Sequence, residues 1–172
     1  DGTPVASGVT ANASGSWSAT FNIPASPSGA HAIDAQGAST RPGSVTAVSF
    51  SINPSISINR ANGSPGTSVT VSGSGFGAGE TGISVSYDGT SVASGVTANA
   101  SGSWSATFNV PASPSGSHVI DAAGASTQKD SVPDLTFTVT PGISLSRTSG
   151  SPGTSITING SGFSANETGI SV

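Results

Sequence analysis

The sequence predicts an all-β protein built from β-sandwich units, and three observations support this fold class. Residues 1–85 align without a gap on residues 88–172, and 60 of the 85 aligned positions are identical. Apolar and hydroxyl side chains alternate along many short segments, which is typical of half-buried strands. Turn residues separate these segments, and no helical period is apparent.

The clearest strand is residues 104–108, where Trp104 and Phe108 alternate with Ser and Thr, and residues 17–21 repeat it 87 positions earlier. About seven strands are expected in each 87-residue repeat, with no significant helix. In the complete copy they cover residues 56–58, 68–72, 83–87, 91–93, 104–108, 117–122 and 135–139. This number and spacing are typical of an immunoglobulin-like β-sandwich.

The inward-facing positions of these strands define the expected core. Phe76 follows a Gly-Ser-Gly break and is expected to close one end of it. The expected core residues are Trp17, Phe21, Trp104, Phe108, Phe76, Phe137, Val69, Val71 and Ile120.

The composition points away from several function classes. Only 7% of the residues are charged, whereas Ser and Thr together number 55 of 172. Four basic residues are too few to follow a phosphate backbone, so no nucleic-acid partner is expected. No apolar run of about 18 residues is present, so no membrane span is expected. A hydroxyl-rich, weakly charged surface favours an extracellular or cell-surface location.

Residues 143–163 (Ile-Ser-Leu-Ser-Arg-Thr-Ser-Gly-Ser-Pro-Gly-Thr-Ser-Ile-Thr-Ile-Asn-Gly-Ser-Gly-Phe) resemble the opening of an IPT/TIG-type immunoglobulin-like domain, and residues 56–76 match them. The later Gly-Ser-Trp-Ser, Phe-x-x-Pro and Gly-x-His pattern is similar to tandem repeats of large prokaryotic surface proteins. The resemblance implies the fold. It leaves function open, because the family occurs in adhesins, stalks, enzyme accessory domains and transcription factors.

The resemblance also places the domain boundaries. Residues 55–141 form a complete domain, residues 1–54 the C-terminal part of another, and residues 142–172 the N-terminal part of a further one. Two interpretations follow: a window from a longer tandem array, which we favour, or a subunit whose two ends complete each other in neighbouring copies. Both give a head-to-tail, open-ended contact, and such contacts build filaments. The residues expected at that contact are Asp1, Gly2, Ile170 and Val172.

The aligned copies differ most between positions 41 and 62, which hold 15 of the 25 differences. This segment spans the last strand and the link to the next unit. We therefore expect alternate joints to be specialised.

No catalytic residue is expected. His31 and His118 each precede an Asp by three positions, but residues three apart on a strand point to opposite faces. A hydroxyl-bonded histidine is the simpler interpretation. Lys129 could form an isopeptide bond, but the other copy has Pro42 at this position, so the bond is discounted.

No cofactor is expected, although loop carboxylates could hold Ca²⁺ at a joint. The weak candidates are Glu80, Asp88, Glu167 and Asp1. Five Asn-x-Ser/Thr sequons are candidate glycosylation sites. They begin at Asn12, Asn99, Asn62, Asn159 and Asn166.

The function that the sequence favours is structural: an extracellular filament, stalk or surface fibre of prokaryotic origin, made of head-to-tail Ig-like domains. The alternative is an adhesin or carbohydrate-binding module, in which Trp17 and Trp104 would stack on sugars. Their place on an alternating strand favours a core role instead.

Overall fold

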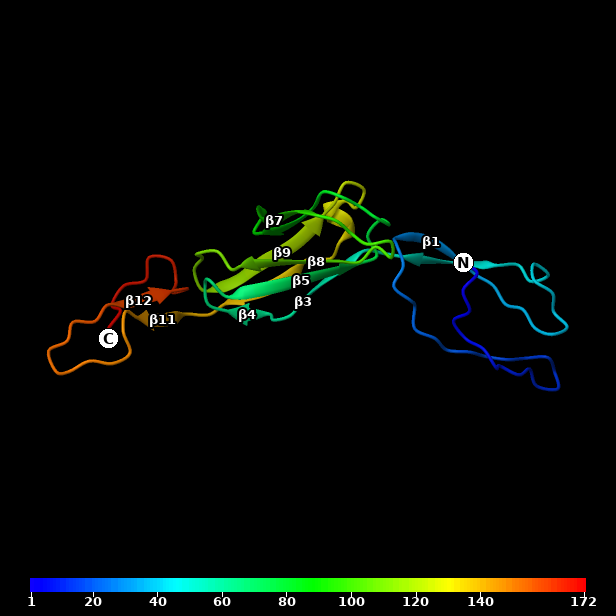
Figure 1. The fold of residues 1–172 in the computed structure, drawn as a ribbon, viewed down its shortest axis with the longest axis horizontal. Helices are drawn as coiled ribbons and strands as arrows, with labels where there is room; N and C mark the ends of the chain where they lie inside the picture. The colour runs from blue at the N-terminus through cyan, green and yellow to red at the C-terminus, as the bar shows by residue number, and fades with distance from the viewer.

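The structure is a computed structural model that describes residues 1–172, and it is elongated. A central β-sandwich lies between an N-terminal segment at one end and a C-terminal segment at the other (Figure 1). We call these parts the central domain (residues 55–141), the N-terminal segment (1–54) and the C-terminal segment (142–172).

The central domain contains eight strands in two sheets. One sheet has the order β3-β5-β8 and the other β4-β10-β9-β6-β7. The strands are β3 (Ser55–Ile58), β4 (Asn62–Gly63), β5 (Ser68–Ser74), β6 (Ile83–Tyr87), β7 (Thr90–Val96), β8 (Trp104–Asn109), β9 (Gly116–Ala123) and β10 (Leu135–Val139). All seven predicted strands are present. The eighth, β4, has only two residues and pairs in parallel with β10.

The alternating pattern places the core between the two sheets. On β5, Val69 and Val71 are fully buried, and the Ser and Thr residues between and beside them face outward or are half-buried. β5 pairs antiparallel with β8, so that Val69 lies opposite Phe108. The seven predicted core residues of this domain are all buried: Val69, Val71, Phe76, Trp104, Phe108, Ile120 and Phe137.

Trp104 closes the core at one end of β8. Its indole lies over Gly73, the residue opposite it in the sheet, and it meets Phe76 edge to face with ring centroids 5.2 Å apart. The sequence explains this contact, because only glycine leaves room for the indole against the sheet.

Each flanking segment contains one strand pair. In the N-terminal segment β1 (Gly29–Ile33) pairs antiparallel with β2 (Val48–Ile52). In the C-terminal segment β11 (Gly142–Leu145) pairs antiparallel with β12 (Ile158–Ser161). A single 3₁₀ turn, η1 (Lys129–Ser131), precedes β10.

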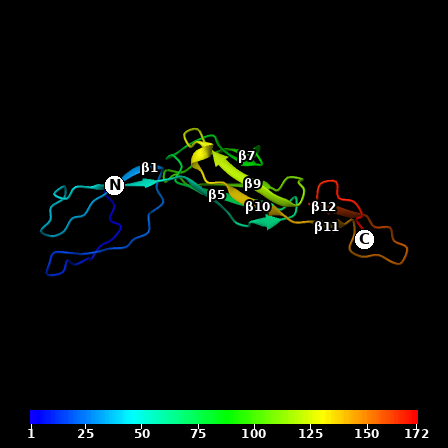
Figure 2. The same cartoon turned by 180° about the vertical axis from the view of Figure 1, so that it is seen from behind.

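The predicted strand at residues 17–21 does not form, and this corrects the expectation for two core residues. Trp17 is 56% exposed and Phe21 is only half-buried. The physical reason is the missing neighbour: β8 is held by β5, whereas the counterpart of β5 at residues 155–161 lies at the other end of the molecule (Figure 2).

No helix of the structure is long and apolar enough to cross a membrane.

Candidate functional site: the joints between units

Each joint between neighbouring units is a two-residue link that ends in proline. Asn53-Pro54 connects β2 to β3, and Thr140-Pro141 connects β10 to β11. Proline holds its φ near about −65° and so limits the swivel of one unit against the next. The contacts beside these short links then fix the orientation of neighbouring units relative to each other.

At the first joint, the N-terminal segment contacts one end of the central domain. The Ser28 N–H donates a hydrogen bond of 3.2 Å to the carbonyl oxygen of Phe76. Gly75 lies against the link: its φ is +68°, and a Cβ built on it would lie 2.7 Å from the Asn53 carbonyl oxygen. Glycine is therefore required here both by conformation and by space.

The second joint repeats these contacts 87 positions later. The Ser115 N–H donates a hydrogen bond of 3.2 Å to the carbonyl oxygen of Phe163. A Cβ built on Gly162 would lie 2.9 Å from the Thr140 carbonyl oxygen. In addition, Ser115 Oγ and Ser164 Oγ are hydrogen-bonded at 3.2 Å.

The same hydrogen bond and the same glycine contact therefore recur at both joints. The expectation that alternate joints are specialised is wrong for these contacts. Most of the sequence differences between positions 41 and 62 fall outside the residues that make these two contacts, and both contacts are kept at each joint.

His118 holds the loop that carries Ser115. Its Nε2 donates to the Pro114 carbonyl oxygen at 3.0 Å, and its Nδ1 donates to Asp88 Oδ2 at 2.6 Å. Both partners are acceptors, so the doubly protonated ring satisfies both bonds at once. The ring also stacks on Tyr87, with ring centroids 5.0 Å apart.

The N-terminal segment contains the same arrangement. His31 bonds through Nε2 to the Pro27 carbonyl oxygen at 2.9 Å and through Nδ1 to Asp1. The other oxygen of Asp1 accepts the Ala32 N–H at 2.9 Å. The joint loop is thus anchored by one Asp–His pair in each copy.

Sequence reasoning missed this pair. It expected a hydroxyl partner for His118 and considered Asp121, which instead accepts the Ala122 N–H at 2.6 Å and lies 3.4 Å from Lys129 Nζ. The true partner, Asp88, is 30 positions before the histidine. The only available signal was that aspartate and histidine recur together at the same two repeat positions.

The Asp88–His118 pair makes stability dependent on pH. Burial opposes the charge on His118, but the bonds to Asp88 and Pro114 outweigh it and raise the pKa of His118 above 6.5. The His118 hydrogen bond chiefly lowers the pKa of Asp88 below 3.8. The stability that protonated His118 contributes is fully present below pH 6.5, and it is lost as the pH rises through the raised pKa of His118. The aspartate contribution is present above pH 3.8 and is lost as the pH falls through its lowered pKa.

We therefore expect His118→Gln to destabilise the central domain most between pH 3.8 and 6.5, and less once the pH has risen through the raised pKa of His118. The expected loss is about 1 kcal/mol, since the Asp88 side chain is 47% exposed and solvent screens the pair. Urea unfolding at a series of pH values measures it. His31→Gln is the matched control, which leaves the central domain unchanged. A stability loss that stays the same from pH 5 to 9 would contradict the charge-based account.

Glu80 is buried at the end of the central domain away from the Asp88–His118 pair. Its carboxylate connects two loops by hydrogen bonds. Its Oε1 accepts the N–H groups of Ser126 and Thr127 at 2.7 and 2.6 Å. Its Oε2 accepts the Gly77 N–H and the Thr127 hydroxyl, both at 2.7 Å. Burial alone would raise the pKa of Glu80, but these four hydrogen bonds outweigh it and lower the pKa to about 2.

The four carboxylates considered for Ca²⁺ each accept hydrogen bonds from neighbouring groups. Glu80 accepts the four bonds described above, and Asp88 accepts from His118 and from the Val119 N–H. Glu167 accepts the Ser164 N–H at 2.9 Å, and Asp1 bonds to His31 and Ala32. No group of three His, Asp or Glu side chains is placed to hold a metal ion.

Two of the five sequon asparagines shape turns. The Asn99 side-chain oxygen accepts the N–H groups of Ser101 and Ser103 at 2.9 and 3.0 Å, and Asn12 does the same in the first copy. The five sequon asparagines are all exposed: Asn12, Asn62, Asn99, Asn159 and Asn166. Glycosylation of these residues stays a prediction.

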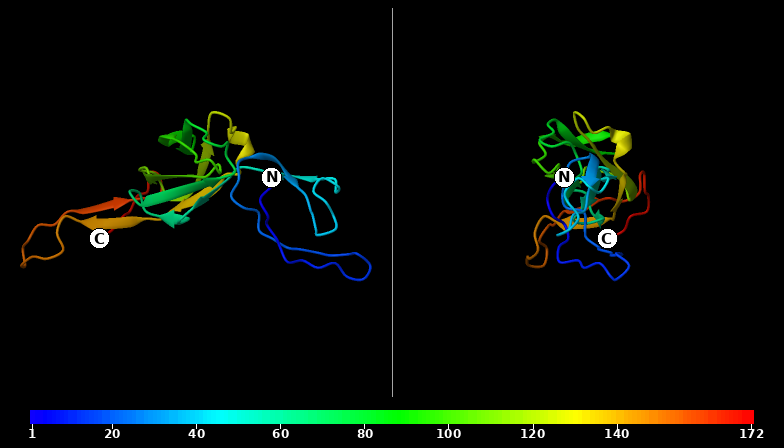
Figure 3. Two further views of the ribbon diagram at one scale, coloured as in Figure 1. Left: turned by 45° about the vertical axis from the view of Figure 1, so that its right-hand side comes forward. Right: turned by 90° about the vertical axis from the view of Figure 1, so that its right-hand side faces the viewer.

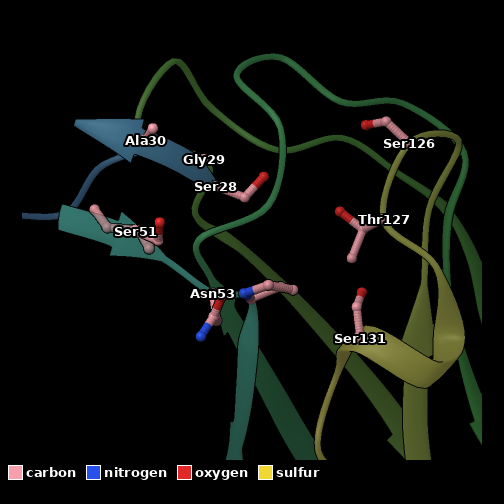
Figure 4. Close-up of a pocket in the computed structure, with 10 residues that line it drawn as sticks. Ser28, Gly29, Ala30, Ser51, Asn53, Ser126, Thr127 and Ser131 are labelled. Carbon is pink, nitrogen blue, oxygen red and sulfur yellow. The ribbon is translucent and has the colours of Figure 1, made fainter. Parts of the chain in front are cut away.

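A groove lies at the first joint, between the N-terminal segment and the central domain. Figure 4 shows the hydroxyl groups of Ser28, Ser126, Thr127 and Ser131 around it. No aromatic ring lines it, and Trp104 is buried at 6% exposure. The groove therefore offers no aromatic surface on which a sugar could stack. Trp17 is 56% exposed but does not line this groove.

The residues expected at the contact between copies lie in the two flanking segments. Ile170 is 58% exposed and Val172 is 96% exposed. Gly2 has a φ of +82°, and Asp1 is bonded to His31 as described. Within one chain, Asp1 and Gly2 do not contact Ile170 and Val172.

A comparison with family models matches the IPT/TIG domain over residues 54–139, which is half of the chain and coincides with the central domain. No curated protein and no solved structure matches the chain. Ig-like domains of this family serve in adhesion or structure and are generally non-catalytic. The match covers both sheets of the central β-sandwich. The chain belongs to the IPT/TIG domain family.

Proposed function

We propose that the chain is a structural protein that forms an extracellular filament, stalk or surface fibre from head-to-tail Ig-like domains, and that it is of prokaryotic origin. The observation that carries this proposal is the equivalence of the two joints. When each unit contacts the next in the same way, the contact is heterologous and repeats along a line. The Ser28–Phe76 and Ser115–Phe163 hydrogen bonds are two successive instances of one such contact.

The path of the chain through the central domain supports a mechanical role. The chain enters β3 at one end of the sandwich and leaves β10 at the other (Figure 1). Tension along the fibre therefore acts along the strands. Four residue pairs join β3 to β5, and five join β10 to β9. Because antiparallel hydrogen bonds lie perpendicular to the strands, this tension loads them together in shear.

The hydroxyl-rich surface supports an extracellular fibre as well. On the outer face of the β3-β5-β8 sheet, Ser55 is hydrogen-bonded to Ser74 and Thr70 to Thr107. These hydroxyl side chains carry no charge, so neighbouring fibres meet little electrostatic repulsion.

Electron microscopy of the isolated protein tests the proposal. We expect thin, unbranched filaments whose axial repeat corresponds to one Ig-like unit. A compact particle without an axial repeat, at concentrations where the protein is abundant, would overturn the structural role.

The joint itself can be tested with Gly162→Val. Its Cβ would lie 2.9 Å from both Thr140 O and Pro65 Cδ, so the C-terminal segment must move away from the central domain. We expect the Ser115 amide, which donates to Phe163, to exchange with solvent on the order of tenfold faster, as measured by NMR hydrogen exchange.

Gly153→Val is the matched control, because Gly153 also has a positive φ (+87°) but nothing lies within 4 Å of its Cβ position. Both variants carry similar backbone strain. Equal exchange rates at Ser115 in the two variants would show that the Gly162 contact does not hold the joint.

A further inference from the structure

One peptide group of the central domain is held from both sides at the second joint. The Pro114–Ser115 peptide bond is trans, so the Pro114 carbonyl oxygen and the Ser115 N–H point in opposite directions from one planar unit. The oxygen accepts a hydrogen bond of 3.0 Å from His118 Nε2, and the N–H donates one of 3.2 Å to the Phe163 carbonyl oxygen across the joint. His118 therefore reaches the joint through a single rigid group.

The first joint repeats this arrangement 87 positions earlier. His31 Nε2 bonds to the Pro27 carbonyl oxygen at 2.9 Å. The N–H of the same peptide group belongs to Ser28, and it donates to the Phe76 carbonyl oxygen at 3.2 Å. A histidine thus holds the donor peptide group at each of the two joints, and this recurrence links the histidine to the joint contact.

We propose that the second joint is a pH-sensitive hinge, which is firm while His118 is protonated and loosens when His118 becomes neutral. The hinge itself stands on the contacts of the joint. Its consequence, a fibre that is stiffer at lower pH, rests on the proposed function and deepens it by adding a means of regulation.

The two ring nitrogens of His118 both face acceptors. Nδ1 lies 2.6 Å from Asp88 Oδ2, and Nε2 lies 3.0 Å from the Pro114 carbonyl oxygen. A protonated ring donates at both positions, whereas a neutral ring has only one N–H. The bond to the carboxylate is charge-assisted and therefore stronger, so the remaining proton stays on Nδ1. Nε2 then turns a lone pair towards the Pro114 oxygen. Two acceptors repel each other, and the peptide group loses its anchor.

Loss of this anchor reaches all the hydrogen bonds that cross the second joint. There are two, and both involve Ser115: its N–H donates to Phe163, and its Oγ is 3.2 Å from Ser164 Oγ. Figures 1 and 3 show the C-terminal segment beyond one end of the central domain and not along its side. The contacts at this end therefore set the angle between the two parts. When Ser115 is free to turn, this angle can vary.

His118 is the group at the hinge that titrates near neutral pH. Burial opposes its charge, but the bonds to Asp88 and Pro114 outweigh burial and raise the pKa of His118 above 6.5. Asp88 and Tyr87 are the titratable side chains that face its ring, and β10 places the apolar Phe137 opposite. The His118 hydrogen bond chiefly lowers the pKa of Asp88 below 3.8, and burial chiefly raises the pKa of Tyr87 above 10. Both neighbours therefore keep their charge while His118 titrates.

The other elements packed against His118 add no charge that faces it. The loop 111–116 and strands β7 and β8 carry no titratable side chain. On β9 itself, Asp121 is three positions away and so points to the opposite face, where Lys129 pairs with it. Across the joint, Glu167 accepts a backbone N–H of its own segment. The hinge is therefore firm below pH 6.5 and loosens as the pH rises through the raised pKa of His118.

Hydrogen exchange of the Ser115 amide in the 172-residue chain tests the hinge. NMR gives its protection factor, which is the exchange rate of an unstructured peptide at the same pH divided by the observed rate. We expect this factor to fall on the order of fivefold as the pH rises through the pKa of His118, because one hydrogen bond is lost. The Ser131 amide, which donates to Gln128 beside η1, is the internal control and should not change.

Three variants assign the effect. In His118→Gln the side chain no longer titrates, so the Ser115 protection factor should stay constant between about pH 5 and about pH 9. Asp88→Asn places a residue that tolerates the positive φ of +49° but removes the charge beside the ring. The fall at Ser115 should then occur at lower pH, a shift that a purely structural role would not cause. His31→Gln, the same change at the first joint, is the matched control and should leave the Ser115 profile unchanged.

Three results would overturn the hinge. The first is a Ser115 protection factor that does not depend on pH, or whose fall persists in His118→Gln. The second is an Asp88→Asn variant in which the fall stays at the same pH. The third is an equal fall at Ser131, because it would mean a general loosening of the domain.

Electron microscopy separates the hinge from the proposed function. We expect filaments that are more bent at about pH 9 than at about pH 5. Filaments that are equally straight at both pH values, together with unchanged Ser115 protection, would mean that the structural role holds and the hinge fails. If no filaments form but Ser115 responds as expected, the hinge holds and the proposed function fails.

Discussion

Gly73→Ala is expected to lower the free energy of unfolding of the central domain by about 3 kcal/mol. A Cβ built on Gly73 would lie 2.1 Å from Cε2 and 2.2 Å from Nε1 of Trp104. The indole cannot retreat easily, because it is buried and packs edge to face against Phe76. Either the strand or the ring must shift, and both changes disturb the packing between the sheets.

Urea unfolding followed by Trp104 fluorescence measures this change. Trp17→Phe provides a background with one tryptophan, since Trp17 lies outside the central core. Ser72→Ala is the matched control: it lies next to Gly73 on β5 but faces solvent, so little change is expected.

A double variant identifies the cause. If the clash with the indole is responsible, Gly73→Ala combined with Trp104→Leu should cost less than the sum of the two single changes. Additive losses would show that Gly73 is required for another reason, such as its own backbone conformation.

The strands of the central domain could be predicted from the sequence because the alternation of apolar and hydroxyl residues is a local property. Residues 68–72 and 104–108 show it without reference to any other part of the chain. β4 was not predicted, because its two residues form a strand only through their pairing with β10.

Trp17 marks the limit of this local reasoning. It lies in the same ten-residue pattern as Trp104, with only Ile23 replacing Val110. Trp104 is 6% exposed and Trp17 is 56% exposed. An identical local sequence thus gives a buried strand in one place and an unpaired segment in the other. The difference lies in whether a neighbouring strand is present.

The joint could be predicted in part. The Asn53-Pro54 and Thr140-Pro141 links are visible in the sequence. The contacts that fix the units depend on atoms brought together by folding: the Phe76 carbonyl oxygen meets Ser28, and Asp88 meets His118. Repetition of the same residue types in both copies pointed to their importance but not to their partners.

Glu80→Gln is expected to cost about 3 kcal/mol of stability at pH 7. The amide supplies one oxygen and one NH₂ group where the carboxylate supplies two oxygens. All four neighbouring groups are donors, from Gly77, Ser126 and Thr127. The NH₂ group therefore faces donors that it cannot accept from, and their buried hydrogen atoms lose a partner. Glu167→Gln is the matched control at the same repeat position and should leave the central domain unchanged.

The pH dependence of the Glu80→Gln effect shows whether the loss of stability comes from the lost charge or from altered packing. The pKa of Glu80 falls from 4.5 to about 2 in the folded protein. A lowered folded pKa gives stability that is fully present above pH 4.5 and is lost as the pH falls towards 2. Lowering the pKa from 4.5 to about 2 corresponds to about 3 kcal/mol of stability. The gap in unfolding free energy between the unmodified chain and Glu80→Gln should therefore narrow from pH 5 to pH 2, as measured by urea unfolding at each pH. A gap that stays constant over this range would mean that Glu80 acts through its packing and not through its charge.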